Sequence, residues 1–250
     1  MPRFGKKIPL LFSLVIWFML WELIGRARLS LIIPPFSSVV AAGITIVPTE
    51  KFGKAVAISL RSFGIGMTLA LAIGIPLGVL MARVATFGKV LAMWVNIFVS
   101  APISALVPIL MAVIGIGETT VVITVFLFAV FVIVLDTEVG VSQANRSLVE
   151  MARCFGARRH QIYTKVLLLS ALPEILAGVR LGAIRGVKGV VIGQLLIAIV
   201  GVGELFELYS QHFLMEEFWA LVTMVFMFAF AVSEAIAFLE RRIEYYASAR

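Results

Sequence analysis

The chain has 250 residues, of which 62% are hydrophobic and 14% are charged, and its formal net charge is +7 at pH 7. A soluble domain carries roughly 25% charged residues, so this composition indicates a chain that is solvated mainly by lipid. At about 20 residues per membrane-spanning helix, the length accommodates six spans and their loops but no separate soluble catalytic domain. The single cysteine, Cys154, excludes a disulfide framework within the chain and a zinc site built from cysteines.

The first apolar segment lies within residues 1–25, where basic residues precede a run from Ile8 to Trp21. This order is typical of a signal peptide, but no small-x-small cleavage site follows, so we predict an uncleaved first span. Pro34 and Pro35 then stop a helix, and Ser37 or Ser38 is expected to cap a short amphipathic helix at the outer membrane surface.

Five further apolar segments predict spans at about 55–82, 90–114, 119–135, 174–200 and 218–239. Gly74-x-x-x-Gly78 in the second span is compatible with a helix-packing face, because small residues let helices approach closely in lipid. Pro102 and Pro108 are expected to break the third span. The sequence therefore predicts an all-α membrane protein with six transmembrane helices.

The basic residues are distributed unequally between the two sides of this predicted topology. The loops and termini on one side carry 13 Lys and Arg residues, whereas those on the other side carry 4. Basic residues are retained on the cytoplasmic side, which also explains the net charge without a nucleic-acid partner. We therefore expect both termini, and the loop between the fourth and fifth spans, to be cytoplasmic.

That loop, Glu150–Pro173, is the most polar stretch of its length in the chain. We expect the loop to form short helices, and a short helix is stable only when something packs against it. The loop is therefore predicted to dock on a soluble partner. Ala152 and Gly156 let a partner approach the backbone, and Gly156 suits the positive φ at which one helix ends. We expect Glu150 to accept hydrogen bonds at a helix start or to pair with a basic residue of the partner. The alternative is an ordinary hydrated loop.

The spacing within this loop resembles the cytoplasmic loop of ABC-importer permeases. The matching positions are Glu150, Ala152, Gly156 and Pro173. Met151 stands where that family usually has a second small residue, and Leu169 where it often has a proline. Residues 33–37, IPPFS, also resemble the stretch before the core of permeases that import nitrate, taurine and alkanesulfonates.

The resemblance implies a type I ABC importer permease fold in a bacterial inner membrane. It divides the chain into a first transmembrane helix with a periplasmic amphipathic segment, a core of five helices, and a cytoplasmic tail, at 1–54, 55–240 and 241–250. Coupling helices would lie at about 144–168. The residues expected to contact the ATPase are Glu150, Ala152, Gly156, Arg158 and Arg159.

The implied partners are a second copy of the permease, two ATP-binding cassette subunits and a periplasmic or lipid-anchored solute-binding protein. The sequence has no G-x-x-x-x-G-K-[ST] phosphate-binding loop, so ATP would bind to a partner subunit. The chain itself is expected to be neither an enzyme nor the holder of a cofactor. His160 and His212 have no other His or Cys at ligand spacing, so we expect no metal site.

Three basic residues, Arg180, Arg185 and Lys188, lie in the first half of the fifth span, and Gln194 follows. The three cover about 140° of the helix and rise about 12 Å along it. A charge inside the bilayer costs several kcal/mol unless it faces protein or water. We predict that Arg185, Lys188 and Gln194 line the translocation pathway and favour an anion such as a sulfonate, nitrate or a carboxylate, with neutral pyrimidine precursors second.

Two alternatives stay open at this point. In the first, the basic residues of the fifth span do not line a pathway: Arg180 extends to the lipid headgroups. Arg185 and Lys188 then pair with acidic residues, namely Asp136, Glu138 or Glu174. The whole chain would instead be an ion-coupled secondary transporter or channel that works without an ATPase, with Asp136 and Glu138 in ion coupling. Secondary carriers tend to show internal repeats, and none is clear in this sequence.

Overall fold

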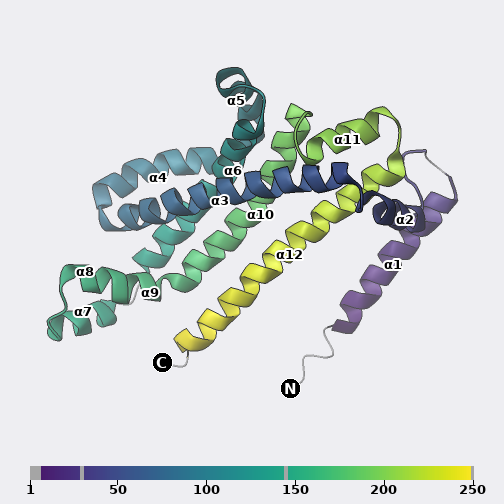
Figure 1. The fold of residues 1–250 in the computed structure, drawn as a ribbon. Coiled ribbons are helices and arrows are strands. Elements are labelled where there is room, and N and C mark those ends of the chain that lie inside the picture. Colours follow the sequence, from purple (N-terminus) through teal and green to yellow (C-terminus); the bar gives the residue numbers. More distant parts are fainter. Residues whose placement is uncertain (1–6, 29–30, 144–145, 249–250) are drawn as a thin grey trace.

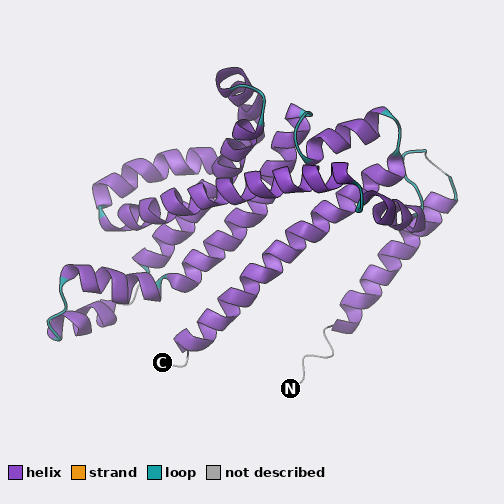
Figure 2. Cartoon of the chain, viewed as in Figure 1, coloured by secondary structure: helices purple, strands orange, loops and turns teal. Residues whose placement is uncertain are grey.

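The structure is a computed structural model that describes residues 7–28, 31–143 and 146–248. Within these ranges it consists of helices joined by short loops (Figures 1 and 2). In chain order the elements are α1 (Lys7–Arg26), α2 (Phe36–Ile46), α3 (Glu50–Arg83), α4 (Ala85–Ser100), η2 (Ile103–Leu106), α5 (Val107–Ile114), α6 (Glu118–Ser142), α7 (Arg146–Cys154), α8 (Arg159–Gln161), η3 (Ile162–Leu167), α9 (Leu168–Ser170), α10 (Leu172–Ile197), α11 (Val202–Gln211) and α12 (Met215–Ser248). The predicted all-α architecture is confirmed.

Three helices of the described chain, α3, α6 and α12, are each long and apolar enough to cross a membrane. Two bent pairs raise the number to five if each counts as one span: α4 with residues 103–114, and residues 159–170 with α10. The protein is therefore a multi-pass membrane protein. Helix α1 covers the predicted first span, and its crossing of the membrane stays a prediction.

The predicted break in the third span is confirmed at one of its two prolines. Pro102 lies between α4 and η2, where the two halves of the span meet at 90°. Pro108 instead lies in the first turn of α5 and interrupts no helix. A first turn tolerates proline because its backbone N–H groups have no partner within the helix.

Helix α6 is the centre of the bundle, with α3 packed on one side and α10 on another. The α3 contacts run through glycines: a Cβ added at Gly66 would lie 2.6 Å from the Val125 Cβ, and one at Gly78 would lie 2.6 Å from the Val134 carbonyl oxygen. Gly74 also contacts α6, so the Gly74-x-x-x-Gly78 packing face is confirmed. Glycines let the helix backbones approach closely, which is how helices associate in lipid.

Helix α2 begins earlier than the sequence predicts. It starts at Phe36, directly after Pro35, without a side-chain cap, so the expected serine cap is wrong. Ser37 instead donates from its backbone N and its Oγ to the carboxylate of Glu22, at 2.9 Å each. The serine therefore joins α2 to α1.

Candidate functional site: an exposed connecting segment and a cavity between helices

The connecting segment, residues 146–170, joins α6 to α10 and lies at one end of the bundle (Figure 1). Helix α7 forms its first arm, and α8, η3 and α9 form the returning arm. Helix α7 packs against the π-helical η3, whose first residue, Ile162, is buried. The two arms therefore hold each other and leave most of their polar side chains exposed.

The chain reverses at Gly156, whose φ is 75°. The backbone N of Ala157 donates to the carbonyl of Ala152 at 2.9 Å, and the N of Gly156 donates to the carbonyl of Arg153 at 2.9 Å. This pair of bonds is a Schellman ending, which satisfies the last carbonyls of α7 and favours glycine at the positive-φ position. The positive φ predicted for Gly156 is confirmed.

The structure brings the five predicted ATPase-contacting residues together in the connecting segment. Glu150, Gly156, Arg158 and Arg159 are exposed, and Ala152 is half-buried. The Gln161 side chain accepts a hydrogen bond from the backbone N of Arg158 at 2.8 Å, which fixes the start of the returning arm. Glu150 does not stand at a helix start, because α7 already begins at Arg146. It is free of that capping role and projects from the middle of α7.

An exposed apolar stripe on α7 is the feature that the sequence analysis missed. Leu148, Met151 and Phe155 are all exposed, and the Phe155 side chain is 85% exposed. Leu148 and Met151 lie on α7, and Phe155 directly follows its last residue, Cys154. The i, i+3, i+7 spacing groups the three on one side, and this spacing is visible in the sequence. A contiguous apolar patch exposed among charged residues marks an interaction surface.

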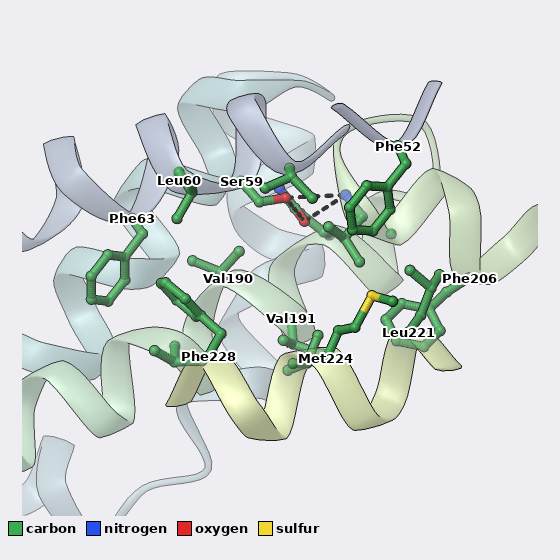
Figure 3. A pocket seen from close by; sticks show the side chains of 16 residues that line it. Phe52, Ser59, Leu60, Phe63, Val190, Val191, Phe206, Leu221, Met224 and Phe228 are labelled. Carbon is green, nitrogen blue, oxygen red and sulfur yellow. Dashed lines mark hydrogen bonds between the residues drawn. The ribbon is translucent and has the colours of Figure 1, made fainter. Parts of the chain in front are cut away.

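A cavity of about 290 Å³ lies between α3, α10, α11 and α12 (Figure 3). The lining residues are Phe52, Val56, Ser59, Leu60, Phe63, Val187, Val190, Val191, Gln194, Val202, Gly203, Phe206, Leu221, Met224, Val225 and Phe228. All are apolar or glycine except Ser59 and Gln194. Of the predicted pathway residues, Gln194 therefore lies at this cavity.

Gln194 joins three helices at the edge of the cavity. Its Oε1 accepts hydrogen bonds from the Ser59 Oγ of α3 at 2.8 Å and from the Val202 N at the start of α11 at 3.1 Å. The residue is 1% exposed, and its Nε2 has no partner in the described part of the chain. Gly201 and Gly203 lie directly against Gln194, so α11 starts in contact with α10.

The predicted basic residues of α10 are not among the residues that line the cavity. Lys188 is exposed and Arg185 is half-buried, and neither lines the cavity. Arg180 donates from Nε to the Ser233 Oγ of α12 at 3.3 Å. Across residues 7–28, 31–143 and 146–248, no ion pair joins Arg185 or Lys188 to the three acidic candidates, although the charges of Arg185 and Asp136 are close enough to interact. A pathway role for Arg185 and Lys188 stays a prediction.

A further ion pair was not predicted from the sequence. Arg61 of α3 contacts Glu118, the first residue of α6, with its Nε 3.3 Å from the Glu118 Oε1. The Ser62 Oγ donates to the same oxygen at 3.5 Å. Two charges 57 positions apart give no local pattern in the sequence. This pair ties the central helix to α3 on the side of α3 that faces away from the cavity.

The fold and the connecting segment define a membrane permease, and comparisons with known proteins identify its class. Residues 74–245 match the family described as binding-protein-dependent transport system inner membrane component. The chain is 26% identical over 238 residues to the taurine transport system permease protein of Escherichia coli, covering 92% of this chain and 86% of that protein. It is 29% identical over 183 residues to a probable ABC transporter permease of Brucella melitensis, covering 73% and 74%.

Two solved structures share the fold. An inward-facing form of the MetNI methionine ABC transporter has a TM-score of 0.67 at 21% identity, covering 77% of this chain and 96% of that one. An amino acid ABC transporter crystallised with histidines has a TM-score of 0.62 at 13% identity, covering 83% and 96%.

The chain belongs to the family of binding-protein-dependent transport system inner membrane components. It is the membrane subunit of an ABC importer, a transport subunit and not itself an enzyme.

Proposed function

We propose that the chain forms the translocation pathway of an ATP-driven importer for a small organic solute that a periplasmic solute-binding protein delivers. The connecting segment carries this proposal. Its exposed apolar stripe and its basic residues suit a soluble ATP-binding subunit, and that subunit would supply the ATP hydrolysis. Exposed apolar side chains are expected to be buried when the partner binds.

The assembly we propose contains two copies of this chain, two ATP-binding cassette subunits and one solute-binding protein in a bacterial inner membrane. Each copy crosses the membrane six times when α1 is included, and both termini are cytoplasmic. The excess of basic residues on the side of the connecting segment supports this orientation, because such residues are retained on the cytoplasmic side. The ATP-binding subunits would bind on that side.

The solute we propose is a small organic anion. The basic residues of α10 support a negative charge, and a similar protein is named as a taurine permease. An ion-coupled carrier that works alone is disfavoured, because the family to which the chain belongs depends on a binding protein.

Reconstitution tests the proposal. The chain is purified together with the ATP-binding and solute-binding proteins encoded beside it, and the complex is placed in proteoliposomes. Uptake is expected only when ATP and the binding protein are both present. Uptake driven by an ion gradient in vesicles that contain this chain alone would contradict the proposal.

A further inference from the structure

The walls of the cavity are built from rings and short branched side chains. Phe52 and Phe63 of α3, Phe206 of α11 and Phe228 of α12 contribute aromatic rings from three helices (Figure 3). The fourth helix, α10, presents only valines beside Gln194, and their shortness leaves the space open. No charged side chain is among the lining residues. The cavity is therefore a nearly pure apolar surface between four helices.

Its two polar side chains are already engaged with each other. The Ser59 Oγ donates to the Gln194 Oε1 and lies within bonding distance of the Val202 N, so these groups face one another and the start of α11. The Gln194 Nε2 has no hydrogen-bond partner in the described part of the chain, but a neutral amide cannot balance the charge of an acid group. Burying an unpaired charge is strongly unfavourable, so only an uncharged group is stable inside.

The cavity volume limits the size of its occupant. An apolar cavity of about 150 Å³ binds benzene, so about 290 Å³ accommodates roughly a dozen non-hydrogen atoms. The aromatic side chains of the walls favour an aromatic ligand, because edge-to-face and offset-stacked ring pairs stabilise binding beyond the contribution of buried apolar area. A lipid acyl chain extends through half of a hydrocarbon core about 30 Å thick, so only its end would fit in this space.

We propose that this cavity binds the apolar body of the transported solute, an aromatic ring or a branched aliphatic group, while the solute's acid group stays outside it. The proposal rests on the proposed function and narrows its solute class. Inorganic anions such as nitrate or bicarbonate, and short sulfonates without an apolar body, gain nothing from these walls. Selection would come from the burial of apolar area, which is absent in those solutes.

Two sulfonates that differ only in their apolar body test the proposal. The full chain is purified in nanodiscs, and thermal unfolding is followed with p-toluenesulfonate and with methanesulfonate. We expect p-toluenesulfonate to raise the unfolding temperature in a saturable manner, because a ligand that binds the folded state stabilises it. Methanesulfonate is expected to leave the unfolding temperature unchanged. Equal effects of the two sulfonates, or none, would overturn the proposal.

A cavity-filling substitution locates the site. Val191→Phe fills part of the cavity with a ring, so we expect the half-saturating p-toluenesulfonate concentration to rise by at least about 10- to 200-fold, the range for a change of a single methylene in an apolar pocket. Leu195→Phe is the matched control, since Leu195 lies on the same helix, outside the cavity, and is 44% exposed. An unchanged response in Val191→Phe overturns the proposal. Mass spectrometry that finds a lipid lost only from Val191→Phe would also overturn it, in favour of a lipid site.

Transport measurements distinguish a failure of the cavity proposal from a failure of the proposed importer function. In the reconstituted complex, Val191→Phe is expected to lower ATP-dependent uptake of the natural solute while Leu195→Phe does not. ATP-dependent uptake that Val191→Phe leaves intact would overturn the role of the cavity but not the importer. Binding of p-toluenesulfonate that depends on Val191, in a complex without ATP-dependent uptake, would overturn the importer and leave an apolar ligand site.

Discussion

The connecting segment and the cavity region use apolar side chains in opposite ways. In the connecting segment, Phe155 is exposed and the backbone is held by local bonds around Gly156. Around the cavity, Phe206 is buried, and Gln194 links the consecutive helices α10 and α11 to α3, which is distant in sequence. The difference separates two ways of building a proposed binding surface: the connecting segment is held by local bonds and exposes its apolar side chains, whereas the cavity is enclosed by contacts between several helices.

The largest expected effect concerns the apolar stripe of α7. Phe155→Ser should weaken binding of the ATP-binding subunits by about 10- to 150-fold, since burial of a phenylalanine contributes about 1.5–3 kcal/mol. Phe213→Ser is the control, because Phe213 is also strongly exposed but lies in the turn between α11 and α12. Co-purification yield and ATPase activity measure the effect. Equal yields for the two variants would remove the contrast between the regions.

The close packing of α3 on α6 gives the next effect. Gly66→Ala should lower the free energy of unfolding by about 1–3 kcal/mol, because the new methyl group meets Val125. At Gly64, on the same helix, an added Cβ meets nothing within 4 Å. Gly64→Ala should therefore be neutral or stabilising by up to about 1 kcal/mol. Unfolding in detergent distinguishes the two, and matching stabilities would contradict the packing role.

The bonds at Gln194 give a more local effect. Gln194→Leu removes the acceptor of the Ser59 Oγ and the Val202 N, and a buried group left unpaired costs about 1–3 kcal/mol. Because Val202 N retains the Ser59 Oγ nearby, we expect the lower end of this range. Hydrogen exchange at the start of α11 should rise in the variant, while exchange in the connecting segment should not. A rise in both regions would show that they are not independent.

The smallest effect concerns a contact between the returning arm of the connecting segment and α3. The Arg83 guanidinium, at the end of α3, lies 3.3 Å from the centroid of the Tyr163 ring in η3. Tyr163→Leu should loosen the segment by about 0.5–1 kcal/mol, and Tyr163→Phe should not, because it keeps the ring. Limited proteolysis of the connecting segment measures this. Equal protection of the two variants would exclude a contribution from the ring.

Local patterns in the sequence predicted much of the fold but little of the contact network. The break at Pro102 and the positive φ of Gly156 each depend on neighbouring residues, and each is confirmed. Of the six predicted spans, up to five are found in the described chain, and the crossing by α1 stays a prediction. The Ser59–Gln194 hydrogen bond and the Arg61–Glu118 pair join residues far apart in sequence, so no periodic pattern predicts them. A cavity is likewise the shape left between four helices, which composition alone does not determine.

The sequence predicted the polar residues of the proposed ATPase contact but not its apolar ones. The polar residues of the connecting segment drew attention to it, and the structure places them together there. Its apolar stripe escaped notice because, in a chain this hydrophobic, Phe155 and Met151 do not stand out by composition. Only the fold shows that they are exposed while similar residues elsewhere are covered.

The π-helical turn of η3 sets the direction in which the connecting segment points. A π-helix accommodates one residue more per turn than an α-helix, as an insertion does. Deleting one residue from Ile162–Leu167 would restore an α-helical turn and rotate everything before it by about 100° relative to α10. Phe155 would then face a different direction, although the backbone hydrogen bonds around Gly156 would be unchanged. The number of residues in this one turn therefore determines which direction the proposed partner-binding surface of the connecting segment faces.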